Sequence, residues 1–208
     1  MVNVIGLGYI GLPTALMLAS HGISVVGTDC NSELVEKLIE GKTNFSEKGL
    51  EQLFRSAVKS GIKFSSEYQA AGIYIIAVPT PYCKLTKKVN PDYVCSSVHE
   101  IIKICPEGAV IIIESTVSPG TIDRYIRPII EENGIKTGKD VSLVHAPERI
   151  IPGNMISELI HNSRTIGADN PKVGMKIKEL YSSFCTGEIV VTDIRTAEMT
   201  KVAENTFR

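Results

Sequence analysis

Short, continuous apolar runs alternate along the chain with longer stretches in which apolar residues recur every three or four positions. A continuous run such as "IYIIAV" is typical of a strand covered on both faces, and the longer spacing is typical of a helix with one buried side. Strands are predicted at 2–5, 23–28, 73–78, 109–115, 142–146, 164–167 and 188–191. Helices are predicted at 9–21, 32–40, 47–59, 91–105, 121–132, 171–184 and from 197 onward.

This alternation of strands and helices predicts an α/β fold built on a doubly wound, mostly parallel sheet. Residues 1–192 are predicted to form one domain that contains the whole sheet. Residues 193–208 are assigned to the start of a further helix. Its pattern continues to the last residue, and no glycine, asparagine or proline follows to close it.

Composition narrows the function classes. Apolar residues make up 43% of the chain, charged residues 22%, and the formal net charge is −1, which gives no reason to expect a nucleic acid or an acidic membrane surface as partner. No apolar run is long enough to span a bilayer, and the first predicted strand starts at residue 2, so we expect a cytoplasmic protein. The five cysteines have no C-x-x-C spacing and the four histidines no i, i+4 pair, so neither a disulfide framework nor a metal site is expected.

A glycine-rich motif joins the first predicted strand to the first predicted helix. In "GLGYIG", Gly6 permits a tight turn, Gly8 lets a pyrophosphate approach the backbone, and Gly11 lets the helix and strand pack closely. The helix then presents free N–H groups and the positive end of its dipole to the anion. We therefore predict that these glycines, with Tyr9 and Ile10 between them, bind a dinucleotide.

The second predicted strand leads into Asp29, 18 residues after Gly11. A carboxylate at this position accepts hydrogen bonds from a ribose 2′-hydroxyl and repels a 2′-phosphate. No arginine follows to receive such a phosphate, so NAD is favoured over NADP. The alternative is a glycine-rich turn without a ligand. The order and spacing of the strand, the glycines, the helix and the acid along the chain favour a Rossmann-type cofactor domain over that alternative.

Three later strands lead into unusual loops, "AVPTP", "ESTVSPGT" and "HAPERIIPGN". They carry the hydroxyls of Thr80 and Thr116 and the carboxylate of Glu148, and proline stiffens each of them, including Pro79. Any one of them could be a stiff turn. Because the carboxyl ends of parallel strands share one sheet edge, three in succession predict a lined cleft beside the cofactor.

These motifs, followed by "AEMTKVAENTFR" at the end, resemble the UDP-glucose/GDP-mannose dehydrogenase family over residues 2–208. The resemblance implies oxidation of a nucleotide-sugar C6 alcohol to a carboxylate in two NAD-dependent steps, with a cysteine that holds the intermediate as a thiohemiacetal and then a thioester. It also implies that Pro79, Thr80 and Thr116 line the cofactor side, with Thr116 near the nicotinamide or a catalytic water. Glu148 would assist thioester hydrolysis. The loop contacting the sugar would comprise Arg149, Ile150, Pro152, Gly153 and Asn154.

Lys201, Asn205 and Arg208 share one face of the last predicted helix. Periodicity alone favours a solvated face. The resemblance instead assigns Lys201 and Asn205 to catalysis and to substrate binding, with Arg208 as a further substrate contact. A lysine ammonium and an amide donor are suited to stabilising a developing oxyanion.

Within the family, the pattern "PER", two apolar residues and "PG" resembles the branch that oxidises UDP-N-acetylmannosamine to UDP-N-acetylmannosaminuronate. UDP-N-acetylglucosamine or UDP-glucose as substrate, a hydroxyacid dehydrogenase and a non-enzymatic NAD-binding module are the alternatives. The family's nucleophilic cysteine lies in a "GxGGxC"-like stretch, a context that none of the five cysteines has. We therefore expect the chain to be the N-terminal part of a longer enzyme, inactive alone and dimeric or larger through its linking helix when complete.

Overall fold

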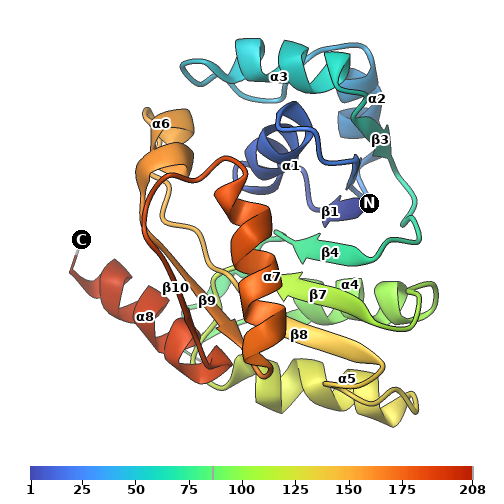
Figure 1. The fold of residues 1–208 in the computed structure, drawn as a ribbon, viewed down its shortest axis with the longest axis vertical. Helices are drawn as coiled ribbons and strands as arrows, with labels where there is room; N and C mark the ends of the chain where they lie inside the picture. The colour runs from blue at the N-terminus through green and yellow to red at the C-terminus, as the bar shows by residue number, and fades with distance from the viewer. Residues whose placement is uncertain (86, 208) are drawn as a thin grey trace.

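The computed structural model describes residues 1–85 and 87–207. Its eight-stranded sheet runs through the middle of the molecule in the order β10-β9-β8-β7-β4-β1-β2-β3 (Figure 1). All neighbouring pairs are parallel except β8 and β9, which confirms the predicted doubly wound, mostly parallel α/β fold. The strands are β1 Val2–Ile5, β2 Val25–Thr28, β3 Lys63–Ser65, β4 Ile73–Ile76, β7 Ala109–Ile113, β8 Val141–His145, β9 Arg164–Ala168 and β10 Ile189–Thr192.

Helices connect the strands, and a small hairpin leaves the sheet after β4. The hairpin pairs β5 Tyr82–Cys83 with β6 Lys88–Val89. One five-residue π-helix, η1, opens the helix after β7. The helical elements are α1 Gly11–Ser20, α2 Ser32–Ile39, α3 Leu50–Lys59, α4 Asp92–Ile102, η1 Ile122–Ile126, α5 Arg127–Glu132, α6 Met155–His161, α7 Pro171–Ser182 and α8 Ile194–Thr206.

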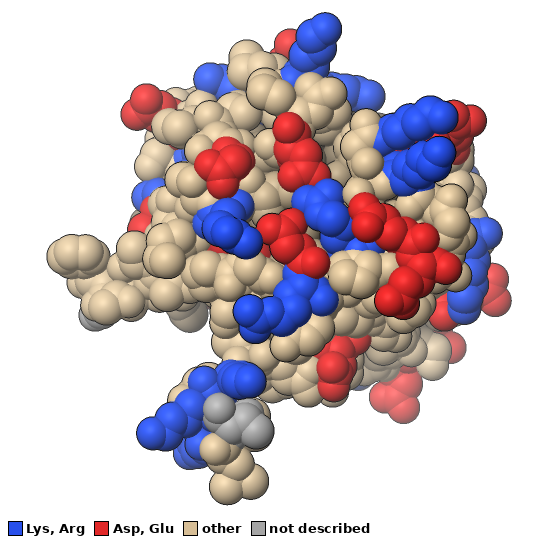
Figure 2. Space-filling view, turned by 90° about the horizontal axis from the view of Figure 1, so that it is seen from below, with Lys and Arg blue, Asp and Glu red and all other residues tan. Residues whose placement is uncertain are grey.

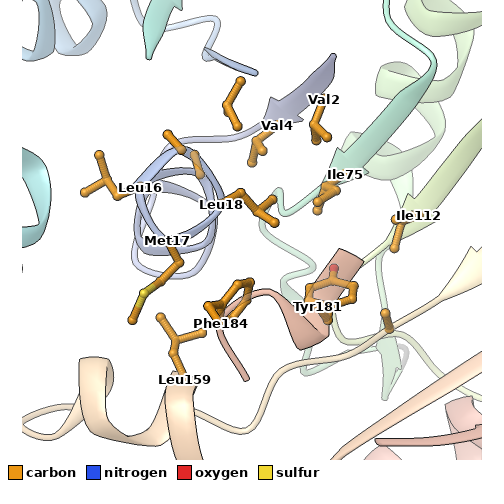
Figure 3. Packing of buried hydrophobic residues seen from close by; sticks show 14 of the residues in the cluster. Val2, Val4, Leu16, Met17, Leu18, Ile75, Ile112, Leu159, Tyr181 and Phe184 are labelled. Atoms are coloured by element: carbon orange, nitrogen blue, oxygen red, sulfur yellow. The ribbon is translucent and has the colours of Figure 1, made fainter. Parts of the chain in front are cut away.

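The strands bury both faces because successive side chains point to opposite sides of the sheet. Val2 and Val4 pack with α1, α6 and α7 on one face, while Ile5 packs with α4, η1 and α5 on the other. Figure 3 shows the first of these cores, where Leu18 of α1 and Tyr181 of α7 meet strand side chains. Two covered faces explain the continuous apolar runs from which these strands were predicted.

The predicted elements are all present, with ends that differ by a few residues. The pattern did not predict β3, the β5–β6 hairpin or α6. These elements are short, and β3 has one exposed and two half-buried residues, so its sequence carries no continuous apolar run. Helix α6 lies in the stretch after "PERIIPGN" that was predicted to be a loop. Within the described residues, no helix is both long and apolar enough to cross a bilayer.

The last helix, α8, does not bury the side that carries most of its large apolar residues. Met199 is 55% exposed and Phe207 is 94% exposed, whereas Glu198 and Lys201 are buried. The helix also begins earlier than predicted, because the Asp193 side chain accepts a hydrogen bond from the Thr196 N–H and caps it. Two charged side chains of α8, Glu198 and Lys201, are therefore directed to the interior, and backbone N–H groups of Gly120 and Ile122 hold Glu198 there.

Candidate functional site

A cleft of about 930 Å³ opens at the carboxyl edge of the sheet, between the loops that follow β1 and β4. Chain order along the sheet reverses between these two strands, and ligands of open α/β sheets bind at such a point. The cleft is lined by residues that follow β1, β2, β4, β7 and β8, together with Lys201 of α8. The sequence-predicted residues among its lining are Gly6, Gly8, Tyr9, Ile10, Asp29, Pro79, Thr80, Thr116, Glu148, Ile150 and Lys201.

The glycine loop has the geometry that a dinucleotide requires. Gly6 has a φ of +88°, and a Cβ on Gly11 would lie 1.9 Å from the Gly6 carbonyl oxygen. A Cβ on Gly8 would meet none of the described atoms within 4 Å. No side chain of the described residues caps the amino end of α1, and no acid lies in its first turn. The glycine loop is therefore closely packed at Gly6 and Gly11 and unobstructed at Gly8. A helix end that binds a pyrophosphate needs such an open approach to its backbone.

Asp29 is held in place at the end of β2. Its Oδ2 accepts a hydrogen bond from the Leu7 N–H at 2.8 Å, and its Oδ1 accepts one from the Asn31 N–H at 2.9 Å. The carboxylate is thus tied to the glycine loop and lines the same cleft. This arrangement fits an adenosine ribose, with the glycine loop on the adjoining phosphates.

Replacing Asp29 with asparagine should reduce the preference for NAD over NADP by about threefold to tenfold, since one carbonyl acceptor remains but the repulsion of a 2′-phosphate is removed. Calorimetric titration of both cofactors into both proteins measures the ratio of the two dissociation constants. An unchanged ratio would show that Asp29 does not face the ribose.

The loops after β4 and β7 are joined by side-chain hydrogen bonds. The Thr80 hydroxyl donates to the Thr116 carbonyl oxygen at 2.7 Å, and the Ser115 hydroxyl donates to the Val78 carbonyl oxygen at 2.7 Å. Because each loop contains proline as well, the cleft wall carrying Thr80 and Thr116 is rigid. Residues on this wall are positioned before any ligand arrives.

Glu148 belongs to a buried ionic cluster that sequence reasoning did not identify. The Arg164 guanidinium forms ion pairs with both Glu148 and Glu114, the latter at 3.2 Å, and all three side chains are at most 5% exposed. The guanidinium carbon lies 4.2 Å from the centre of the Tyr181 ring, and the Tyr181 hydroxyl donates to Glu114 at 3.2 Å. The second oxygen of Glu148 accepts from the Arg149 N–H at 2.6 Å. Glu148 is thereby fixed at the wall of the cleft.

One guanidinium cannot fully compensate two buried carboxylates. Burial raises the pKa of Glu114 to about 7, and the nearby Glu148 carboxylate adds to the rise, while Arg164 opposes it. A carboxyl whose pKa is higher in the folded than in the unfolded state stabilises the fold at low pH. That stabilisation is lost as the pH rises from about 4.3 to 7.

Glu114→Gln should therefore gain stability relative to the natural protein by about 1–3 kcal/mol between pH 5 and pH 8, because glutamine stays neutral. Urea unfolding of both proteins at the two pH values measures this difference. Other titrating groups, such as His145, are common to both proteins and cancel. A difference in stability that is the same at pH 5 and pH 8 would contradict the expected ionisation of Glu114.

Lys201 enters the cleft from α8 and is only 6% exposed. Two features bring α8 close to the sheet. Gly167 of β9 has no side chain, and a Cβ there would lie 2.7 Å from the Cβ of Ala197. The buried Glu198 carboxylate accepts hydrogen bonds from the Gly120 and Ile122 N–H groups, the latter at 3.0 Å. The loop that carries Thr116 and the helix that carries Lys201 are thus linked.

His145, at the end of β8, is fully buried, and its Nδ1 donates a hydrogen bond to the Ile113 carbonyl oxygen at 2.8 Å. Burial, with a smaller contribution from the Lys201 ammonium, lowers the pKa of His145 to about 4. The imidazole is therefore neutral at pH 7, so its Nδ1 carries the proton that this carbonyl accepts.

Several predicted residues that the structure describes lie outside the cleft lining. Asn205 is one of them and is exposed on α8, whereas Arg208 lies outside the described residues. Arg149 forms an ion pair with Glu204 of α8 instead of entering the cleft. The backbone N–H of Ile151 donates to Glu158 at 2.7 Å, which holds the loop of residues 149–154. Within the described residues, the structure thus brings Lys201 and Glu148 to the cleft but not Asn205, Arg149, Pro152, Gly153 or Asn154.

None of the five cysteines, all of which lie within the described residues, forms a disulfide. Cys30 lines the cleft, but it follows β2, four strand positions from β8 in the sheet. At about 4.8 Å per strand, roughly 19 Å separates those two strands, so Cys30 lies at the opposite end of the cleft from Glu148. Cys185 is buried, and its thiol donates to the Asn162 carbonyl oxygen at 3.3 Å. Neither side chain is placed to attack a group held by Lys201.

The fold and the cleft are matched by known proteins. The model of the UDP-glucose/GDP-mannose dehydrogenase family, NAD binding domain, matches residues 1–185. The chain belongs to this family. The chain is the family's NAD-binding domain, so the dinucleotide that the glycine loop and Asp29 fit is NAD.

Individual relatives agree with this assignment. The UDP-N-acetyl-D-mannosamine dehydrogenase of Methanococcus aeolicus is 44% identical over all of this chain and 47% of its own. The solved UDP-N-acetyl-mannosamine dehydrogenase of Staphylococcus aureus is 41% identical, with a TM-score of 0.93 over 100% of this chain and 51% of that one. A UDP-glucose dehydrogenase of Pyrobaculum islandicum is 27% identical, with a TM-score of 0.85 over 99% of this chain and 49% of that one. The chain thus spans about half the length of these nucleotide-sugar dehydrogenases.

Proposed function

We propose that this chain is the cofactor-binding part of an enzyme that oxidises the C6 alcohol of UDP-N-acetylmannosamine to UDP-N-acetylmannosaminuronate. The observation that carries the proposal is the cleft, in which one edge of the sheet brings the dinucleotide loop together with Thr116, Glu148 and Lys201. The substrate follows from two relatives with more than 40% identity that bear this activity in their names. The more distant similarity to a UDP-glucose dehydrogenase supports the family but not that sugar.

Each residue would contribute a distinct chemical function. NAD, when bound, supplies the hydride acceptor. The Lys201 ammonium, held in a nearly dry setting, would donate to the C6 oxygen as negative charge develops there. Glu148, fixed by Arg164 and the Arg149 N–H, would accept a proton from the water that hydrolyses the thioester. Thr116 would lie between the cofactor and the sugar.

The nucleophilic cysteine and the nucleotide-binding half are proposed to lie in the remainder of a longer protein, and residues 193–208 to begin the linking helix. Dimerisation through that helix, a role for Asn205 and Arg208 in substrate binding and a cytoplasmic location remain predictions. So does the sugar contact of residues 149–154.

The longer protein, with the length of its relatives, tests the proposal. NADH formation and uronate release should be measured with UDP-N-acetylmannosamine, UDP-N-acetylglucosamine, UDP-glucose and a simple hydroxyacid. We expect the highest kcat/KM with UDP-N-acetylmannosamine and no uronate from the 208-residue chain alone. A comparable kcat/KM with UDP-glucose would refute the substrate but not the family. Turnover of the hydroxyacid alone, or none at all, would refute the proposed reaction.

A further inference from the structure

Glu47 links the glycine loop to the loop of residues 149–154. It lies between α2 and α3, outside every motif that the sequence presents. Its Oε1 accepts a hydrogen bond from the Tyr9 hydroxyl at 2.6 Å and another from the Gly153 N–H at 2.8 Å. These two donors are 144 positions apart in the chain, and a single carboxylate oxygen joins them.

The contact is supported from several sides. The Tyr9 ring packs against Phe45, with 5.2 Å between the ring centres. Burial, together with the Glu47 carboxylate, raises the pKa of Tyr9 to about 12, so the hydroxyl keeps its proton. Hydrogen bonds from Tyr9 and Gly153 lower the pKa of Glu47. The pair is therefore a charge-assisted hydrogen bond over the physiological pH range.

Both ends of this link reach the cleft. Tyr9 lines it beside Gly8 at the amino end of α1, and Ile150 lines it from the 149–154 loop. A ligand that fixes the glycine loop would restrain Tyr9, and through Glu47 it would restrain the Gly153 backbone. By thermodynamic linkage, a ligand that fixes the second loop must then favour binding at the first.

We propose that Glu47 is a positioning residue that couples dinucleotide binding to the conformation of residues 149–154. The inference rests on the proposed function, in which these two loops serve the cofactor and the sugar. It extends that function, because it predicts that bound NAD restrains the loop of residues 149–154, which is proposed to contact the sugar. Glu47 joins the two loops through one shared oxygen, so removal of its carboxylate or of the Tyr9 hydroxyl should weaken the coupling between them.

Hydrogen exchange of the 208-residue chain, with and without saturating NAD, tests the coupling. In the natural protein, NAD should slow exchange of the amides of Ile151, Gly153 and Asn154 by about fivefold or more, at the lower end of measured couplings. Glu47→Ala, which leaves no acceptor, and Tyr9→Phe should each reduce this slowing to below about twofold with NAD still bound to saturation. Glu51→Ala is the matched control, because Glu51 is exposed in the next helix and pairs with Arg55 at the surface.

The double variant should show no greater loss than either single variant, since both changes interrupt one link. Persistent slowing in Glu47→Ala, or additive losses in the double variant, would overturn the inference. NAD binding to the natural protein without any response of residues 151–154 would overturn the inference alone. Failure of the natural protein to bind NAD would overturn the proposed function as well.

Discussion

Arg164→Met is expected to lower the free energy of unfolding at pH 8 by about 3–5 kcal/mol, the loss typical of removing one partner from a buried ionic cluster. Methionine keeps much of the aliphatic volume but leaves Glu114 and Glu148 facing each other without a cation. The side chains of all three residues are at most 5% exposed, so water cannot compensate. The loss of contact with the Tyr181 ring adds to the effect. Urea unfolding measures the change.

The pH dependence separates the lost charge from lost packing. At pH 5 the Glu114 carboxyl, whose pKa is raised to about 7, can hold a proton, so the destabilisation of Arg164→Met should be smaller than at pH 8. Arg195→Met is the matched control, because Arg195 is 73% exposed and pairs with Asp123 at the surface, where such a pair contributes little. A loss for Arg164→Met below about 1 kcal/mol, or one that is equal at both pH values, would contradict the importance of the cluster.

Lys201→Ala in the longer enzyme is expected to lower kcat for UDP-N-acetylmannosamine about a hundredfold or more, as the loss of an oxyanion donor does elsewhere. The ammonium is nearly buried in the cleft that also holds Thr116 and Glu148, so its field there is little screened. The effect should fall mainly on kcat, since the charge that Lys201 stabilises develops only as the reaction proceeds. Initial-rate kinetics with NAD in excess measure both constants.

Lys176→Ala provides the comparison, because Lys176 is an exposed lysine of α7, away from the cleft. It should leave kcat and KM unchanged. If Lys201→Ala raises KM with kcat intact, Lys201 binds the ground state and the transition state equally, and if neither constant changes, Lys201 has no part in the reaction.

The sequence contained enough to predict the fold and the cofactor half of the site. Continuous apolar runs identified the strands because both faces of the sheet are covered, and the glycine motif with Asp29 is local, so its geometry follows from neighbouring residues. The loops that carry Thr80, Thr116 and Glu148 were predicted to line one cleft, because the carboxyl ends of parallel strands lie at the same edge of the sheet.

The parts that could not be predicted depend on contacts between distant segments. Arg164 contacts Glu114, which lies 50 positions earlier in the chain, and Glu47 contacts Gly153, which lies 106 positions later. No local sequence pattern at Arg164 or at Glu47 indicates these contacts. The buried side of α8 was missed for another reason. An acid such as Glu198 on a helix is usually solvated, and only the unpaired N–H groups at Gly120 and Ile122 make its burial favourable.

The most direct test of the account is NAD binding to Gly8→Ala, measured by calorimetry beside the natural chain. A methyl group at Gly8 meets none of the described atoms within 4 Å, so the fold should keep its stability, but it would occupy the face that a pyrophosphate must approach. Gly72→Ala is the matched control, since its Cβ is equally unobstructed within the described structure and Gly72 does not line the cleft. We predict that the natural chain and Gly72→Ala each bind one NAD per chain with the same dissociation constant. Gly8→Ala should bind NAD at least about tenfold more weakly, a loss of about 1.4 kcal/mol in binding free energy. Equal binding of NAD by Gly8→Ala and Gly72→Ala, or no binding by the natural chain, would contradict the assignment of this cleft to the cofactor.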